Sequence, residues 1–294
     1  GEYAFSPPLP FTQGQEVVGR ILDWGEGVAG RKVGDRVMAV TSFVSGNGGF
    51  AEECLVLDDF CLDAPHDLDD TRAAGFLIPF HTALLALERR GRLERGETLL
   101  VLGGAGGTGS AAIGVGRALG ARVIATAGGE GKADFCRSLG ADRVIDHRSE
   151  DIAESVMADT GGRGVDVVFD PVGGAAFTSA SRCIAPEGRI LAVGFASGEW
   201  GRVDTAHLVN HNYSVLGVIP TGYVPAMREE MQQRLLGWWR TGRLELPVHE
   251  LVSFEALPSA LERLLAGDVL GKLSLAVGTS KSGSEPIRNG IPAP

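Results

Sequence analysis

From Thr98 onward, short apolar runs alternate with stretches of helical periodicity. An apolar run over 98–102 is followed by a helical pattern over 107–119 and a second apolar run over 122–127. The later predicted elements are helix 131–139, strand 143–145, helix 149–159, strand 165–169, helix 174–184, strand 188–193 and strand 213–218. Strands that alternate with helices indicate parallel pairing through right-handed crossovers, so the pattern predicts a doubly wound α/β sheet.

The segments outside this alternation have a different pattern. The first part of the chain contains strand-like runs separated by glycine and proline, over 17–25, 35–40 and 50–57. Residues 71–90 have helical character, and Pro79 is expected to break this helix or to begin its second part. Towards the end, the sequence predicts a helix over 225–241, a helix over 255–266 and a strand over 272–277.

The junction between the apolar run 98–102 and the following helix carries the most informative motif. Its residues are Gly104, Ala105, Gly106, Gly107, Thr108 and Gly109, and the glycines fit G-x-G-x-x-G. Glycines there allow a tight turn and a close approach of a pyrophosphate, and the helix start presents free N–H groups to it. Together with the flanking strands, the motif predicts a dinucleotide site. A glycine-rich loop in another kind of α/β protein is the alternative.

Composition narrows the class of partner and the compartment. With 294 residues, 44% of them hydrophobic, the chain can bury the cores of two domains. The net charge of −10 argues against a nucleic-acid partner. No apolar run is long enough to span a bilayer, no signal peptide is recognisable, and the four cysteines lack C-x-x-C spacing. We therefore expect a cytoplasmic protein without membrane partner, ending in a flexible Ser/Gly/Pro-rich tail over 278–294.

Several motifs occur in the order seen in a known family. They are PPLPFTQGQEVVGRI, VAGRKVGDRVMAV, GGFAEECLV, AGGTG, DPVGG, AVGFASG and GKLSLAV. In these strings the chain resembles the zinc-free quinone oxidoreductase branch of the medium-chain dehydrogenase/reductase superfamily, over residues 1–277. The resemblance implies a GroES-like, mainly β catalytic domain (1–80 and 225–277) around a Rossmann dinucleotide-binding domain (81–224), with NADPH in the cleft.

The start of the chain departs from this family pattern. The family carries several tens of residues before its PPLP segment, and these are absent before Pro7. Either the sequence is trimmed there, or the substrate pocket is incomplete. The resemblance also implies a homodimer joined through the nucleotide-binding domain, because the apolar run 213–218 is expected to be the last strand of the sheet. The alternative is a strand covered by the chain's own C-terminal helix.

The residues at the expected zinc position do not favour a metal. Zinc-dependent relatives have histidine where this chain has Gln15, and glutamine is a poor zinc ligand. The four-cysteine lobe of those relatives is missing as well. His207 and His211 have helical i, i+4 spacing, but no third ligand accompanies them. The sequence therefore predicts no metal.

The end of the second predicted strand indicates which dinucleotide binds. Residues 126–129 contain no acidic residue to hold a ribose hydroxyl, which permits NADP. The resemblance assigns Lys132 to the 2′-phosphate, and it places His147 and Arg148 where the family often has Tyr-Arg. Lys132 and Arg148 as ordinary solvated charges are the alternative, and Glu130 keeps NAD open.

The resemblance also assigns the nicotinamide end. Thr82 resembles a family threonine that contacts the carboxamide. Val193, Gly194 and Phe195 end a predicted strand at its carboxyl edge, where ligands bind in such sheets. For Phe195, contact with the cofactor and packing in the core remain equal alternatives.

Without zinc, the acceptor oxygen needs another hydrogen-bond donor. Tyr3 resembles a family pocket tyrosine and is our candidate catalytic residue, with an exposed terminal side chain as the alternative. Three functions follow. The first is an NADPH-dependent quinone oxidoreductase, and the second is a reductase of the C=C bond in an enone or enoyl thioester. The third is a non-catalytic NADPH-binding protein, expected if the N-terminal pocket is missing.

Overall fold

The computed structural model describes residue 7 and residues 9–278, and its largest unit is a six-stranded sheet. The strands are β4 (Thr98–Val101), β5 (Arg122–Ala127), β6 (Arg143–Asp146), β7 (Val165–Asp170), β8 (Ile184–Ala192) and β9 (Ser214–Gly217). They pair in parallel in the order β6-β5-β4-β7-β8-β9. The order reverses between β4 and β7, which confirms the predicted doubly wound fold.

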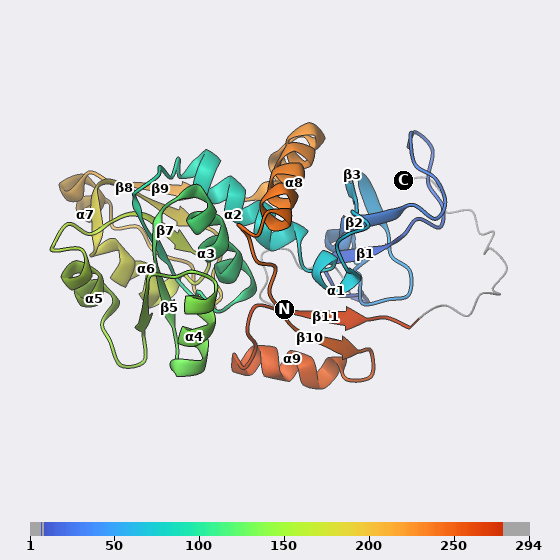
Figure 1. Cartoon of the computed structure of the whole chain (residues 1–294). Coiled ribbons are helices and arrows are strands. Elements are labelled where there is room, and N and C mark those ends of the chain that lie inside the picture. Colours follow the sequence, from blue (N-terminus) through green and yellow to red (C-terminus); the bar gives the residue numbers. More distant parts are fainter. Residues whose placement is uncertain (1–6, 8, 279–294) are drawn as a thin grey trace.

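Helices cover both faces of this sheet (Figure 1). They are α3 (Gly107–Leu119) and α4 (Glu130–Ser138) on one face, and α5 (Ile152–Asp159), α6 (Gly174–Ser181) and α7 (Thr205–His211) on the other. Successive side chains of a strand point to opposite faces, so Leu99 of β4 packs in the first layer and Leu100 in the second. The bounds of α3 and β5 agree with the prediction to the residue, because glycines mark both ends of that helix.

Two smaller sheets lie outside the large sheet, one beyond α8 (Pro225–Arg240) and the other below α8 in the view of Figure 1. One is antiparallel and contains β1 (Glu16–Arg20), β2 (Arg36–Thr41) and β3 (Val56–Asp63). The other pairs β10 (Val248–Ser253) with β11 (Lys272–Ala276) in parallel, and α9 (Leu257–Ala266) connects these two strands. Both ends of the described chain thus build the mainly β part of the molecule.

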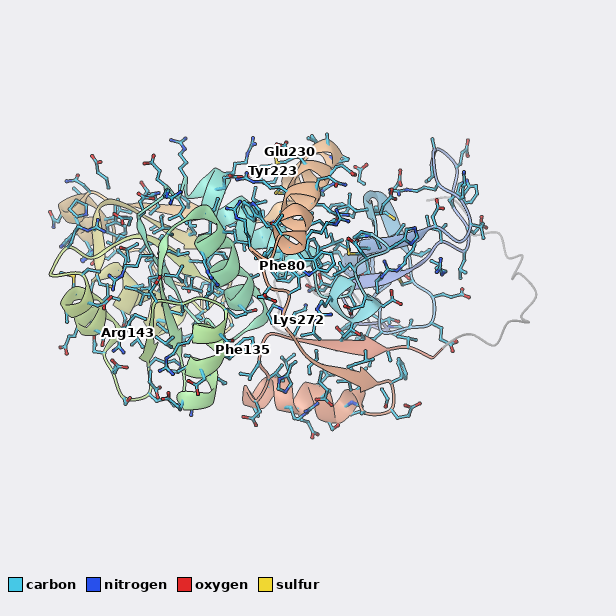
Figure 2. The ribbon with its side chains drawn as sticks, in the orientation of Figure 1. Phe80, Phe135, Arg143, Tyr223, Glu230 and Lys272 are labelled. Carbon is cyan, nitrogen blue, oxygen red and sulfur yellow. The ribbon has the colours of Figure 1, made fainter. Side chains whose placement is uncertain are left out.

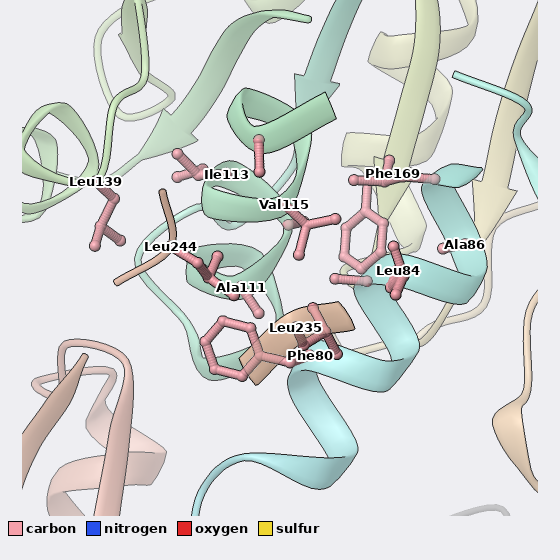
Figure 3. Packing of buried hydrophobic residues seen from close by; sticks show 14 of the residues in the cluster. Phe80, Leu84, Ala86, Ala111, Ile113, Val115, Leu139, Phe169, Leu235 and Leu244 are labelled. Carbon is pink, nitrogen blue, oxygen red and sulfur yellow. The ribbon is translucent and has the colours of Figure 1, made fainter. Parts of the chain in front are cut away.

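The segment predicted as a helix broken at Pro79 is helical, but its geometry differs from the expectation. It contains α1 (Asp70–Ala73), a π-helix (Leu77–His81), α2 (Thr82–Leu84) and a second π-helix (Leu85–Arg90). Proline supplies no N–H for the regular i→i−4 bond, and the wider π turn accommodates Pro79 without ending the helix. Figure 3 shows this segment packed against α3 and α8, with Phe80, Leu84 and Leu235 in the shared core.

Several predicted bounds were wrong, because β1 ends at Arg20 and not at residue 25, and β8 begins at Ile184, inside the segment predicted as helix 174–184. Residues 50–55, predicted as strand, are irregular, and β3 begins only at Val56. The preceding glycines explain this, since a Cβ on Gly48 would lie 2.2 Å from the carbonyl oxygen of Gln13, so the chain must pack backbone against backbone there. The strand β10 was not predicted at all. Leu251 in its middle is exposed, and its apolar positions do not form a clear alternation.

Candidate functional site

The glycine motif forms the turn between β4 and α3. A Cβ on Gly104 would lie 2.9 Å from the Cβ of Ala125, and one on Gly109 would lie 2.2 Å from the carbonyl oxygen of Gly103. These two positions therefore leave no room for a side chain. Gly106 is exposed, and as the N-cap of α3 it offers no side-chain oxygen to the first N–H groups of the helix. The turn thus presents backbone donors at a helix N-terminus, the arrangement that binds a pyrophosphate.

The neighbouring edge of the sheet carries the predicted basic side chains. His147 and Arg148 follow β6, and both lie over Gly128 at the end of β5, where a Cβ would be 2.7 Å from Arg148 Nε and 3.1 Å from His147 Nε2. Asp146 ties the two loops together, because its carboxylate accepts the N–H groups of Arg148 at 3.0 Å and Gly129 at 3.1 Å. These bonds hold the pKa of Asp146 below its usual value.

Lys132, the third predicted basic residue, follows β5 in the chain. It lies in the first turn of α4, and its Nζ would be 3.4 Å from a Cβ on Gly267 at the end of α9. The carboxylate of Glu130 accepts a hydrogen bond from Arg137 at 2.7 Å, so it is directed along its own helix.

The residues predicted for the nicotinamide end lie near strand ends of the large sheet or in the adjoining helix. Thr82 begins α2 and is buried. Val193 and Gly194 follow β8, and their N–H groups donate to the carbonyl oxygen of Asp170 at 2.9 and 3.3 Å. Phe195 is half-buried and stacks on Trp200, so packing accounts for one face of its ring. The predicted catalytic Tyr3 lies outside the described residues, as does the tail from residue 279 onward.

His81, directly before Thr82, is a buried titratable group that the sequence did not single out. Burial, together with the nearby Arg228 guanidinium, lowers the pKa of His81 to about 3. The imidazole is therefore neutral at physiological pH. It adds no positive charge to this end of the site.

Lys272 is a site residue that sequence reasoning missed. Gly271 donates its N–H to the carbonyl oxygen of Ala105 at 2.8 Å, so the start of β11 is docked on the glycine turn. The stem of Lys272 lies over Gly107, where a Cβ would be 2.7 Å from Lys272 Cδ. Its Nζ pairs with the buried carboxylate of Glu16 at 2.6 Å. Figure 2 shows Lys272 at the junction of the two parts of the molecule.

The arrangement around Lys272 joins β1, the π-helix and the nucleotide turn. The second oxygen of Glu16 accepts the N–H of Ile78 at 2.8 Å. A buried carboxylate thus holds an ammonium group beside the N-terminus of α3, where a pyrophosphate is expected. The sequence contained a signal in the string GKLSLAV, but nothing local related that lysine to the glycine turn.

The possible metal ligands of the described part of the chain do not gather into one set. Across the described residues, no group of three or more His, Cys, Asp or Glu side chains is arranged to hold a metal ion. The rings of His207 and His211 stack with centroids 3.9 Å apart, and His211 Nδ1 lies 2.9 Å from the carbonyl oxygen of His207. The two imidazoles therefore do not converge on a common point.

Residues 107–238 match the family described as zinc-binding dehydrogenase, and residues 1–66 match the alcohol dehydrogenase GroES-like domain. Quinone oxidoreductase-like protein 2 of Bos taurus is 33% identical over 282 residues, which are 94% of this chain and 79% of that protein. Its homolog in Nematostella vectensis is 31% identical over 93% of this chain and 75% of that protein.

Solved structures give the same relationship. The NADPH complex of Escherichia coli quinone oxidoreductase has a TM-score of 0.84 at 26% identity, covering 92% of this chain and 83% of that one. A probable oxidoreductase from Mycobacterium abscessus has a TM-score of 0.80 at 36% identity, covering 94% of this chain and 83% of that one.

Fold, nucleotide turn and relatives together define an NAD(P)H-binding oxidoreductase of the medium-chain dehydrogenase/reductase superfamily. Within it, the chain belongs to the zinc-free quinone oxidoreductase branch, as the sequence motifs predicted. The mainly β part is accordingly the GroES-like domain. Within the part of the chain that the structure describes, no helix is both long and apolar enough to cross a membrane.

Proposed function

We propose that this protein transfers a hydride from NADPH to a quinone or a similar activated carbonyl, without a metal ion. The observation that carries the proposal is a dinucleotide turn in a chain that has Gln15, directly before β1, at the position where zinc-dependent relatives have a metal-binding histidine. A quinone is easily reduced, so it needs alignment and a hydrogen-bond donor more than a Lewis acid. Two electrons and one hydrogen leave NADPH, a proton comes from a donor or solvent, and the products are NADP⁺ and the hydroquinone.

The residues around the turn fit this cofactor. The free N–H groups at the start of α3 and the ammonium group of Lys272 would hold the pyrophosphate. Arg148, with His147 and Lys132, would hold the 2′-phosphate beyond the acid-free end of β5. The bound nicotinamide supplies the hydride. Thr82 would orient its carboxamide, and Tyr3 is our proposed donor to the acceptor oxygen.

Steady-state oxidation of NADPH, with a quinone and an enone assayed in parallel, tests this function. We expect turnover with the quinone to be the faster of the two. Turnover with the enone alone would replace the proposal with C=C reduction. Oxidation with neither acceptor, together with NADPH binding, would identify a non-catalytic binding protein.

A direct metal analysis tests the zinc-free part of the proposal. After dialysis against a chelator, elemental analysis should find less than a stoichiometric amount of any metal, because glutamine at position 15 is a poor zinc ligand. The rate of NADPH oxidation should be the same before and after dialysis. Loss of the rate on dialysis and its return with Zn²⁺ would contradict the prediction.

We further propose a homodimer that pairs through β9. This strand ends the six-stranded sheet, and Ile219 just beyond it is 50% exposed. An open strand edge beside apolar surface favours pairing with a second copy. Light scattering at micromolar concentration should therefore give the mass of a dimer. A monomer in the parent protein would refute it.

A charge at this edge should weaken the dimer. In the Ser214→Lys variant, two copies would bring like charges together across the strand edge, and we expect the dissociation constant to rise about tenfold or more. Ser259→Lys, at an exposed position of α9, is the matched control and should leave the dimer unchanged. Equal effects of both variants would show that added charge, and not the β9 edge, causes the change.

A further inference from the structure

The loop that follows β8 is held firmly at the carboxyl edge of the sheet. The N–H groups of Ala196 and Ser197 donate to the carbonyl oxygens of Pro171 and Val172, each at 3.0 Å. At the other end of the loop, Gly201 packs on the ring of Phe177 in α6. A Cβ added to Gly201 would lie 2.5 Å from the Cγ of that ring. Both ends of the loop thus contact the segment that follows β7.

Two aromatic side chains of this loop stack on each other. The ring centroids of Phe195 and Trp200 are 4.3 Å apart, with 29° between the ring planes. Phe195 is half-buried, whereas Trp200 is 53% exposed. The phenyl ring therefore supports one face of the indole, and much of the remaining indole surface is open to solvent. A large apolar ring that is fixed in place and exposed is a suitable surface for binding another flat ring.

The loop that carries the stack follows β8 at the carboxyl edge of the sheet, and ligands of such sheets bind at that edge. The strand order reverses between β4 and β7, and ligands of such sheets bind outside the carboxyl ends of the strands at that point. Arg148 lies over the end of β5 and marks the adenosine end. The nicotinamide end of the cofactor would then extend towards β7 and β8. The loop that contains Trp200 directly follows β8. An acceptor has to come within about 3.5 Å of the reacting nicotinamide carbon.

We propose that Trp200, supported by Phe195, is the surface on which the ring of the acceptor stacks, so that fused-ring quinones are preferred to small aliphatic enones. The proposal rests on the proposed function and specifies its substrate class. A quinone ring is flat and electron-poor because of its two carbonyl groups. The face of an indole is electron-rich, so the two rings attract each other when stacked. A short aliphatic enone offers no ring for this contact.

Kinetics with two acceptors test the assignment. For Trp200→Ala we expect the KM for a naphthoquinone to rise about tenfold, which corresponds to about 1.4 kcal/mol. The KM for methyl vinyl ketone, the kcat values and the affinity for NADPH should stay within about twofold of the parent. Trp200→Phe keeps a flat ring and should restore most of the lost affinity. Trp24→Ala, which removes an indole 45% exposed in the β1–β2 loop, is the matched control and should change neither KM.

A binding measurement without turnover separates this proposal from the function on which it rests. A naphthoquinone should quench the tryptophan fluorescence of the parent saturably, and Trp200→Phe should lose that saturable part while Trp24→Phe retains it. If the parent reduces neither acceptor, the proposed function fails, and this titration still decides the stacking surface. Saturable quenching retained in Trp200→Phe would overturn the proposal. An equal change of KM for both acceptors in Trp200→Ala would do so too.

Discussion

Gly109→Ala should lose dinucleotide binding almost completely. The new methyl group would lie 2.2 Å from the carbonyl oxygen of Gly103 and 3.0 Å from the Cα of Gly104, and backbone atoms cannot move aside as a flexible side chain can. We expect a loss of at least about 3 kcal/mol in the binding of NADPH or in the free energy of unfolding, at the upper end of the cost of overpacking. Calorimetric titration and thermal unfolding measure the two effects.

Gly237→Ala is the matched control for this variant. Gly237 lies within α8, and an added Cβ there meets no atom within 4 Å. Alanine at an open helical position stabilises by about 0.4–1 kcal/mol, so this variant should bind NADPH like the parent and unfold at a slightly higher temperature. If Gly109→Ala also binds NADPH like the parent, the turn described here is not the pyrophosphate site.

NADPH should bind more tightly than NADH, and the preference should depend on the basic residues around the end of β5. Arg148→Ala and Lys132→Ala are each expected to weaken NADPH by about 1.5–3 kcal/mol, the range for a hydrogen bond to a charged group. Their effect on NADH should be small, because NADH has no 2′-phosphate. Calorimetric titration of each variant with both nucleotides measures this difference.

Lys272→Ala is the control for the Lys132→Ala and Arg148→Ala variants, because it should not change the preference between NADPH and NADH. Its ammonium group lies beside the glycine turn, where both nucleotides carry the same pyrophosphate, so this variant should weaken NADPH and NADH to the same extent. Equal affinity of the parent for NADPH and NADH would refute the preference. If a variant that lacks both the Lys132 and the Arg148 side chain still prefers NADPH to NADH, other residues must cause the preference.

The parts of the fold that were predicted well carry local signals. Glycines flank both ends of α3, and apolar runs of strand length precede and follow this helix. The bounds of helix 107–119 and strand 122–127 could therefore be predicted to the residue. The π-helices around Thr82 have no such signal, because a wider helical turn keeps nearly the same apolar periodicity. The irregular segment 50–55 was mistaken for a strand, since the packing of Gly48 against the backbone of Gln13 leaves no trace in the local pattern.

The sequence by itself determined the alternation of strands and helices, the glycine turn and the acid-free end of β5, because each depends on residues close together in the chain. Only the tertiary structure placed Lys272 over Gly107, joined Glu16 to the π-helix and stacked Phe195 on Trp200. The first two contacts join segments far apart in the chain, and the third depends on how a glycine-containing loop turns back on itself. Contacts between distant segments and the path of a loop leave no periodic pattern in the sequence. Both are determined only when the whole chain packs.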